Sequence, residues 1–273
     1  MARRAWFGLR WIAVGAGVGV VAVLLGVVIA MRLRTGSWSL PDGDDLVHIA
    51  RGSRTGPPSR VIYLQREPLE IAYGDDDARR NRSGIVSGTR TSWKLPGFRG
   101  SASGWKAIVG CVRQQFAPFD LEVTDVRPER GDYILVAVGG KPRDIGLTRR
   151  NVGGLAPFSG EAIPNAVVFA FAQTLGNRSR VICETIAMEV GHAYGLDHEY
   201  LCKDVMTYLS GCGNKSFVDA DAPCGEKKRR PCAPGGAVTQ NSYRHLASTV
   251  GRRAMNDTVV QPSASDQMSR SHR

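Results

Sequence analysis

The segment DYILVAVGG, at residues 132–140, constrains the fold more than any other part of this 273-residue chain. Its unbroken apolar run is typical of a strand buried on both faces, because a strand with one solvated face alternates apolar and polar residues. Four further segments have strand-like composition, namely RVIYLQRE (60–67), LEVTDV (121–126), GGLAPF (153–158) and NAVVFAFA (165–172). The sequence therefore predicts a sheet with a buried central strand.

Two segments have the apolar spacing of helices. Residues 103–120 carry apolar side chains at helical intervals, and Pro118 closes the pattern. The second predicted helix runs from a cap at Ser179 to Tyr194, where Gly195 ends it. This order of elements predicts an α+β fold, with a twisted, mixed, α/β-like upper sheet packed on two main helices. The loop-rich chain beyond the second helix predicts an irregular C-terminal subdomain.

Cysteine usage indicates an oxidising compartment. All six cysteines follow residue 110, and four of them crowd into about thirty residues, as is typical of disulfide-stabilised domains. None has the CxxC spacing of a cysteine-based zinc knuckle. Cys111 and Cys183 fall on the two predicted helices, so they either bridge them or are both small buried residues, and we favour the bridge. The disulfide candidates are Cys111, Cys183, Cys202, Cys212, Cys224 and Cys232.

The chain divides into four parts. Residues 1–34 include the uncharged stretch 11–31, which at about 20 residues is long enough to cross a bilayer as a helix. Because this stretch exceeds the usual apolar region of a signal peptide, we expect a membrane anchor, with a cleaved signal segment as the alternative. Residues 35–59 predict a linker, 60–250 the main domain and 251–273 a disordered tail. The domain is then expected outside the cytoplasm, either membrane-anchored or secreted after cleavage.

The net charge of +11 lies at the two ends of the chain. Residues 1–34 hold five arginines and no acid, and residues 226–273 hold nine Lys or Arg against three acids, whereas the middle is balanced. Nucleic-acid binding calls for a basic patch on a folded face, so no nucleic-acid partner is expected. The run EKKRR, at residues 226–230, is expected to be a solvated loop.

The stretch MEVGHAYGLDH, which begins at Met188, contains the candidate catalytic and metal-binding residues. Met188 and His192 are four apart, so they share one face of the predicted helix, and Glu189 flanks the same cleft. Gly195 permits a sharp turn, because glycine accepts a positive φ at low cost. That turn can bring His198 back toward His192.

This stretch resembles the metzincin superfamily of zinc endopeptidases, whose pattern is HExxHxxGxxH followed by a methionine-containing turn. The resemblance implies that His192 and His198 bind Zn²⁺. It implies that Glu189 is the general base that helps a zinc-activated water to hydrolyse a peptide bond. Gly195 matches the turn glycine of the pattern. The partner would be a peptide or protein substrate.

The segment VMTY extends the resemblance. Met206 matches the methionine beneath the metal site, and Tyr208 matches a tyrosine that can bind zinc or stabilise the oxyanion. The motif spans about 20 residues, and the metzincin-like architecture covers residues 60–250. It further implies a substrate-pairing edge strand in residues 165–172. The four C-terminal cysteines would form disulfides that stabilise the loops around the methionine turn.

Met188 departs from the pattern, which has histidine as the first zinc ligand. A thioether suits Cu(I) better than Zn²⁺, and catalytic zinc normally takes three ligands from histidine, carboxylate or thiolate. Either Tyr208 completes a His/His/Tyr site, or another residue supplies the ligand, or the domain is a pseudoprotease. A pseudoprotease would bind a peptide or partner protein in the former cleft. A disulfide-stabilised surface protein without a working cleft ranks last.

Three acidic residues are considered as substitute ligands. Asp197 and Glu199 flank His198 and stay open as candidates. Glu184 lies about 12 Å along the helix from His192, by the rise of about 1.5 Å per residue, and is a poor candidate.

Overall fold

The computed structural model describes residues 56–148 and 151–254. The predicted membrane segment at 11–31, most of the linker at 35–59 and nearly all of the tail at 251–273 therefore lie outside the described residues. Within the described ranges, no helix is long and apolar enough to cross a membrane.

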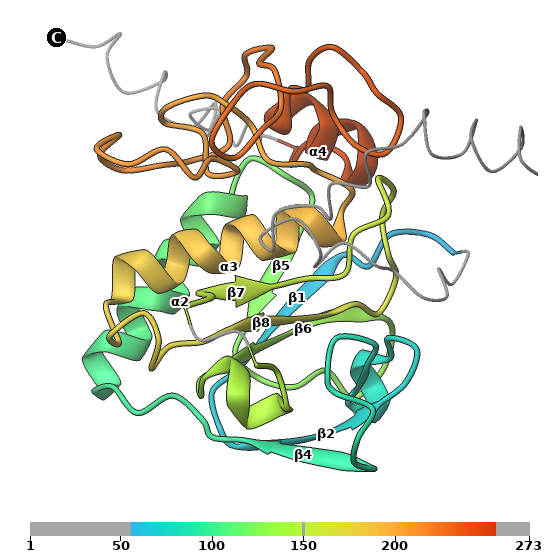
Figure 1. The fold of residues 1–273 in the computed structure, drawn as a ribbon, viewed down its shortest axis with the longest axis vertical. Helices are drawn as coiled ribbons and strands as arrows, with labels where there is room; N and C mark the ends of the chain where they lie inside the picture. The colour runs from blue at the N-terminus through green and yellow to red at the C-terminus, as the bar shows by residue number, and fades with distance from the viewer. Residues whose placement is uncertain (1–55, 149–150, 255–273) are drawn as a thin grey trace, which may run out of the picture. The chain divides into compact units, whose positions relative to one another are not determined.

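A five-stranded sheet forms the centre of the described domain (Figure 1). Its order is β5 (Glu122–Thr124), β1 (Val61–Gln65), β6 (Tyr133–Val138), β8 (Val167–Ala170) and β7 (Gly154–Leu155). The first four strands are parallel, and β7 is antiparallel to β8. Every residue of β6 is buried, which confirms the predicted central strand. The mixed sheet and its helices confirm the α+β class.

The predicted edge strand in residues 165–172 is wrong, because the edge strand nearest that segment is β7, and β5 lies at the opposite edge. The strand in that segment, β8, pairs with β6 on one side and β7 on the other. All of its residues are buried. The physical reason is visible in the sequence, because a continuous apolar run is typical of an interior strand. The two-residue β7 is too short to give a periodic signal.

Two helices, α2 (Ala102–Phe116) and α3 (Ser179–Ala193), cover one face of the sheet (Figure 1). The side chain of Ser101 caps α2 by accepting a backbone N–H. The predicted cap of α3 at Ser179 is off by one residue. Arg178 is the N-cap residue and makes no side-chain cap, so Ser179 already lies in the first turn.

The other face of the large sheet is covered by a smaller sheet of order β3-β2-β4 (Figure 1). Two apolar clusters result, one between the helices and the large sheet and one between the two sheets. The elements of this second layer are β2 (Leu69–Tyr73), η1 (Ala78–Arg80), β3 (Arg82–Ser83), β4 (Ser92–Leu95) and η2 (Pro142–Ile145).

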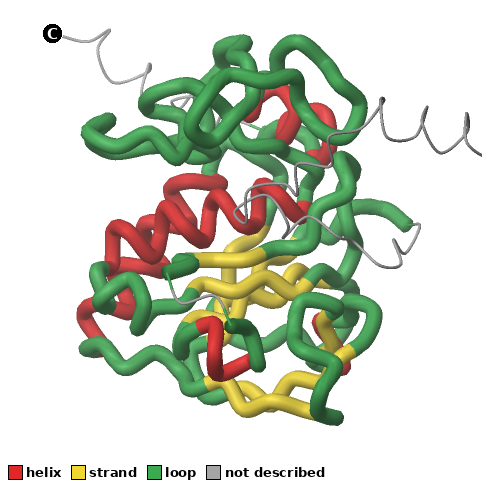
Figure 2. The backbone as a smooth tube through the Cα atoms, viewed as in Figure 1, coloured by secondary structure: helices red, strands yellow, loops and turns green. Residues whose placement is uncertain are grey.

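From the end of α3 to residue 254 the described chain is irregular except for one helix, α4 (Ser242–Val250), as Figure 2 shows. Disulfides join Cys202 to Cys212 and Cys224 to Cys232, which confirms a disulfide-rich C-terminal subdomain. The helix α4 was not predicted. Disulfide bonds of this kind are typical of an extracellular or secreted domain.

A third disulfide, Cys111–Cys183, joins α2 to α3 and confirms the favoured bridge. The double variant Cys111→Ser/Cys183→Ser is expected to lower the free energy of unfolding by about 4 kcal/mol, because the bond restrains a long stretch of the unfolded chain. Its two cysteines are 72 positions apart, against 10 for Cys202 and Cys212. Urea unfolding measures the loss of stability in this variant and in Cys202→Ser/Cys212→Ser. A smaller loss from the first pair than from the second would contradict the prediction.

Asp76 gives the domain a pH-dependent stability. Its Oδ1 accepts the Val167 N–H at 3.3 Å, and burial raises the pKa of Asp76 to about 6. The unfolded pKa is lower, so the free energy of unfolding falls as pH rises from about 4 to 6 and stays low above that. Asp76→Asn keeps an acceptor oxygen but has no proton to lose. Its free energy of unfolding should exceed that of wild type by about 2–3 kcal/mol at pH 7.5, but not at pH 4. Urea unfolding at both pH values, with exposed Asp75→Asn as control, tests this; a pH-independent difference would refute it.

Candidate metal centre

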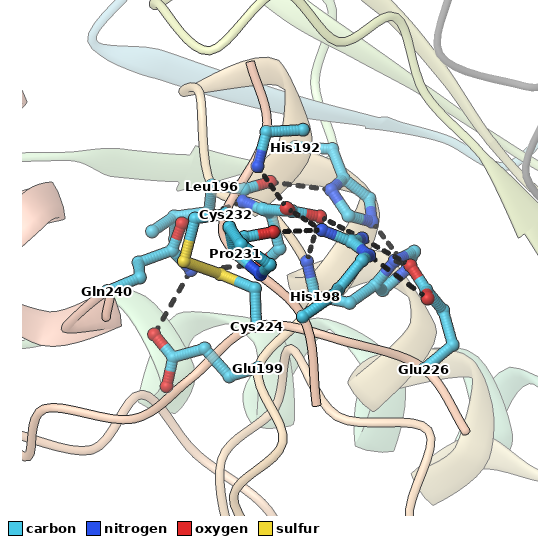
Figure 3. A network of polar contacts seen from close by, with 12 residues as sticks. His192, Leu196, His198, Glu199, Cys224, Glu226, Pro231, Cys232 and Gln240 are labelled. Carbon is cyan, nitrogen blue, oxygen red and sulfur yellow. Dashed lines mark hydrogen bonds and ion pairs between the residues drawn. A yellow bond between two sulfur atoms is a disulfide. The ribbon is translucent and has the colours of Figure 1, made fainter. Parts of the chain in front are cut away.

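The candidate site lies where α3 ends and the chain turns back toward it. His192 lies in the last turn of α3, and Gly195 follows with a φ of +94°. A Cβ at Gly195 would stand 2.8 Å from backbone atoms of Gly160. The positive φ and this close approach both require glycine. The turn returns His198 to His192, and Figure 3 shows the two rings together.

The two imidazoles face each other inside the protein. Nε2 of His192 lies 3.0 Å from Nε2 of His198, and both residues are buried. Nδ1 of His192 is 2.7 Å from the Leu196 carbonyl oxygen, and Nδ1 of His198 is 3.0 Å from Oε1 of Glu226. A carbonyl and a carboxylate can only accept, so each Nδ1 carries a proton and donates. The Nε2 lone pairs then point at each other and repel. A shared proton or a metal cation between them would stabilise this arrangement.

This pair of imidazoles fits zinc as two of its ligands. Tetrahedral zinc, with Zn–N bonds of 2.0–2.1 Å, holds two nitrogens about 3.3 Å apart. The observed separation of 3.0 Å is close to that spacing. Histidine ligands usually donate their other N–H to a carbonyl or a carboxylate, as His192 and His198 both do.

Met188 does not add a third zinc ligand of the usual kind. It is half-buried and packs against the apolar cluster between the helices and the large sheet. Its thioether sulfur is neutral and soft, and it lies outside the ligand types of catalytic zinc. The motif itself therefore offers two nitrogen atoms as candidate ligands.

Tyr208 is the further candidate, and it lies beside His198. Its ring centroid is 4.3 Å from that of His198, and the residue is 55% exposed. The three acidic candidates are engaged by other groups. Their partners are Arg230 for Asp197 at 2.5 Å, Gln240 for Glu199 at 3.1 Å and Arg180 for Glu184 at 2.7 Å.

Glu189 lies between α3 and the edge of the sheet. A Cβ added to Gly154 would stand 2.5 Å from its Oε1, so the carboxyl packs directly against β7. Burial raises the pKa of Glu189 to about 8. In the metal-free protein the carboxyl is therefore mostly protonated at pH 7, and a nearby cation would favour its charged form.

The segment that contains Met206 packs against α3. Met206 is fully buried, and a Cβ at Gly191 would stand 2.6 Å from its sulfur. The carbonyl of Met206 accepts the Glu199 N–H at 3.1 Å, and its own N–H donates to Asp204 at 2.7 Å. The Met206 side chain therefore packs directly on the backbone of α3 at Gly191.

A polar network around His198 was missed by the sequence analysis. The run 226–230 was expected to be a solvated loop, which is wrong for its two ends, because Glu226 and Arg230 are half-buried. Hydrogen bonds from His198, and then from Arg230, hold the pKa of Glu226 well below its usual range. The sequence feature that could have predicted this network is a glutamate and an arginine four positions apart, between two closely spaced cysteines.

Three groups of this network could in principle bind a cation by themselves. Ligand atoms of Asp197, His198 and Glu226 lie within 4.8 Å of one another. Arg230 already supplies positive charge there, since its guanidinium lies 2.5 Å from each carboxylate. The Nε2 side of His198, which faces His192, is therefore the better place for a metal.

The chain matches no family model, and it matches no curated protein at a significant level.

Proposed function

We propose that this chain is a zinc-dependent endopeptidase of the metzincin type that acts outside the cytoplasm. The observation that carries the proposal is the convergence of His192 and His198 at 3.0 Å, with His192 three positions after the buried Glu189 on the same helix. The carboxyl packs against β7, an antiparallel edge strand. One helix, α3, thus carries a candidate nitrogen ligand and a candidate proton-transfer group, and the second group contacts a strand edge.

His192, His198 and Tyr208 are the residues that would hold the zinc ion. Bound zinc supplies a Lewis acid that polarises the scissile carbonyl and activates water. An extended peptide lies along β7 through main-chain hydrogen bonds. Glu189 takes a proton from the attacking water and returns it to the leaving amine. A carboxyl with a pKa near neutrality is suited to both steps.

The test uses the full chain with its disulfides intact. Zinc content after dialysis and cleavage of a peptide mixture are measured with and without a chelator. We expect about one zinc per chain, and cleavage that stops on chelation and returns with added zinc. A protein that neither retains zinc nor cleaves peptides would overturn the proposal.

Met188 favours a second candidate, a pseudoprotease that binds a peptide or partner protein in the same cleft. Its thioether replaces a nitrogen ligand and packs against the apolar cluster of the fold. This candidate predicts peptide binding that needs no zinc and causes no cleavage. Fluorescence anisotropy of labelled peptides, with and without a chelator, separates the two functions.

A further inference from the structure

His198 is held on both its main chain and its side chain by one short loop. This loop, residues 224–232, is closed by the Cys224–Cys232 disulfide and is called the cystine loop here (Figure 3). The N–H of Gly225 donates to the His198 carbonyl at 2.9 Å. The next residue, Glu226, accepts from Nδ1 of His198 at 3.0 Å.

Arg230 fixes Glu226 within the cystine loop. Its Nη2 lies 2.5 Å from Oε1 of Glu226, the same oxygen that faces His198. Its two terminal nitrogens also bind Asp197, at 2.5 and 2.8 Å. The Arg230 N–H donates to the Cys224 carbonyl at 2.8 Å, across the loop. Glu226 is thus held by the loop closure and by a guanidinium that is itself anchored to Asp197.

The charges of this network favour a cation at His198. Asp197 and Glu226 share the single guanidinium of Arg230, which leaves one net negative charge beside the imidazole. A carboxylate that accepts the Nδ1 proton of a histidine fixes the tautomer and makes Nε2 a more basic ligand.

We propose that Glu226 is a positioning residue that sets the metal affinity of the site by orienting and polarising His198. The proposal rests on the proposed function, because it requires that His192 and His198 hold a metal ion. It adds that a residue outside the motif, 28 positions beyond His198, determines how tightly they do so. Arg230 and the disulfide act through Glu226 by keeping it in place.

The first test measures zinc affinity by competition with a chromophoric chelator, using the full oxidised chain. Glu226→Gln keeps the size and an acceptor oxygen but removes the charge, so we expect a zinc Kd about 10-fold to 100-fold higher. Lys228→Gln is the matched control, since it changes the charge of an exposed residue in the same loop. Its Kd should equal that of wild type. Equal Kd values for Glu226→Gln and wild type would overturn the proposal.

The second test needs no metal and separates this proposal from the proposed function. Imidazole ¹⁵N chemical shifts of the metal-free protein should show His198 protonated at Nδ1, and Glu226→Ala should populate the other tautomer. If wild type binds no zinc, the proposed function fails, and this measurement alone decides whether Glu226 orients His198. An unchanged tautomer in Glu226→Ala would overturn the orienting role. Should Glu226→Ala not fold, Glu226→Leu provides the same comparison, because leucine also lacks an acceptor atom and comes closer to the size of glutamate.

Discussion

Met188→His is expected to raise the zinc affinity of the protein about a hundredfold to a thousandfold. Position 188 lies four residues before His192, so a histidine there shares the same face of α3. Structural zinc sites bind with about 10–16 kcal/mol in total, and one further imidazole should contribute several kcal/mol of this. Chelator competition measures the affinity, and we expect peptide cleavage to increase in parallel.

Met188→Leu is the matched control for this gain. Leucine keeps the apolar packing that Met188 makes against the cluster under α3 and offers no ligand atom. Its zinc affinity should equal that of wild type. If Met188→His binds zinc no more tightly than Met188→Leu, the resemblance of this helix to a zinc-binding helix is misleading.

Glu189→Gln is expected to lower kcat for peptide cleavage about 100-fold to 10,000-fold while leaving the zinc content unchanged. Glutamine has the size of glutamate and fits beside Gly154, but it cannot accept and return a proton. Glu184→Gln is the control on the same helix, because Glu184 is bound to Arg180. Its kcat should match that of wild type. Substantial cleavage by Glu189→Gln would remove Glu189 from the mechanism.

The stability of Glu189→Gln shows whether a loss of activity comes from the missing proton-transfer group or from unfolding. The pKa of Glu189 is about 8 in the folded, metal-free protein, against an ordinary value of 4.5. The free energy of unfolding of wild type therefore falls as pH rises from about 4.5 to 8, since the folded state binds the proton more tightly. Glu189→Gln has no such loss. Urea unfolding at pH 8.5 should show it to be more stable than wild type, and a less stable variant would contradict this.

The parts of the fold that were predicted correctly depend on local patterns. The buried strand β6 and the helices α2 and α3 each have a periodicity that lies within one segment. The Cys111–Cys183 bridge followed from placing one cysteine on each helix. The spacing of the candidate site residues from Glu189 to His198 could be recognised for the same reason, because these residues lie on one helix and the turn that follows it.

The parts that were missed depend on contacts between distant segments. Glu226 reaches His198 only because the cystine loop folds back, and cysteine spacing alone does not fix that pairing. The ion pair between Arg230 and Asp197 joins positions 33 apart and occupies the Asp197 carboxylate. The edge role of β7 depends on which strands pair, and so it cannot be read from the composition of one strand.

The brevity of β7 has a consequence for self-association. A sheet edge offers unpaired main-chain groups to other copies of a protein as readily as to a substrate. In the described residues β7 comprises only Gly154 and Leu155, and Pro157, which cannot donate a main-chain hydrogen bond, follows closely. Very short edge strands and proline are two means by which proteins prevent edge-to-edge aggregation. The edge thus offers room for a few residues of an extended peptide, and too little for a stable cross-molecule sheet.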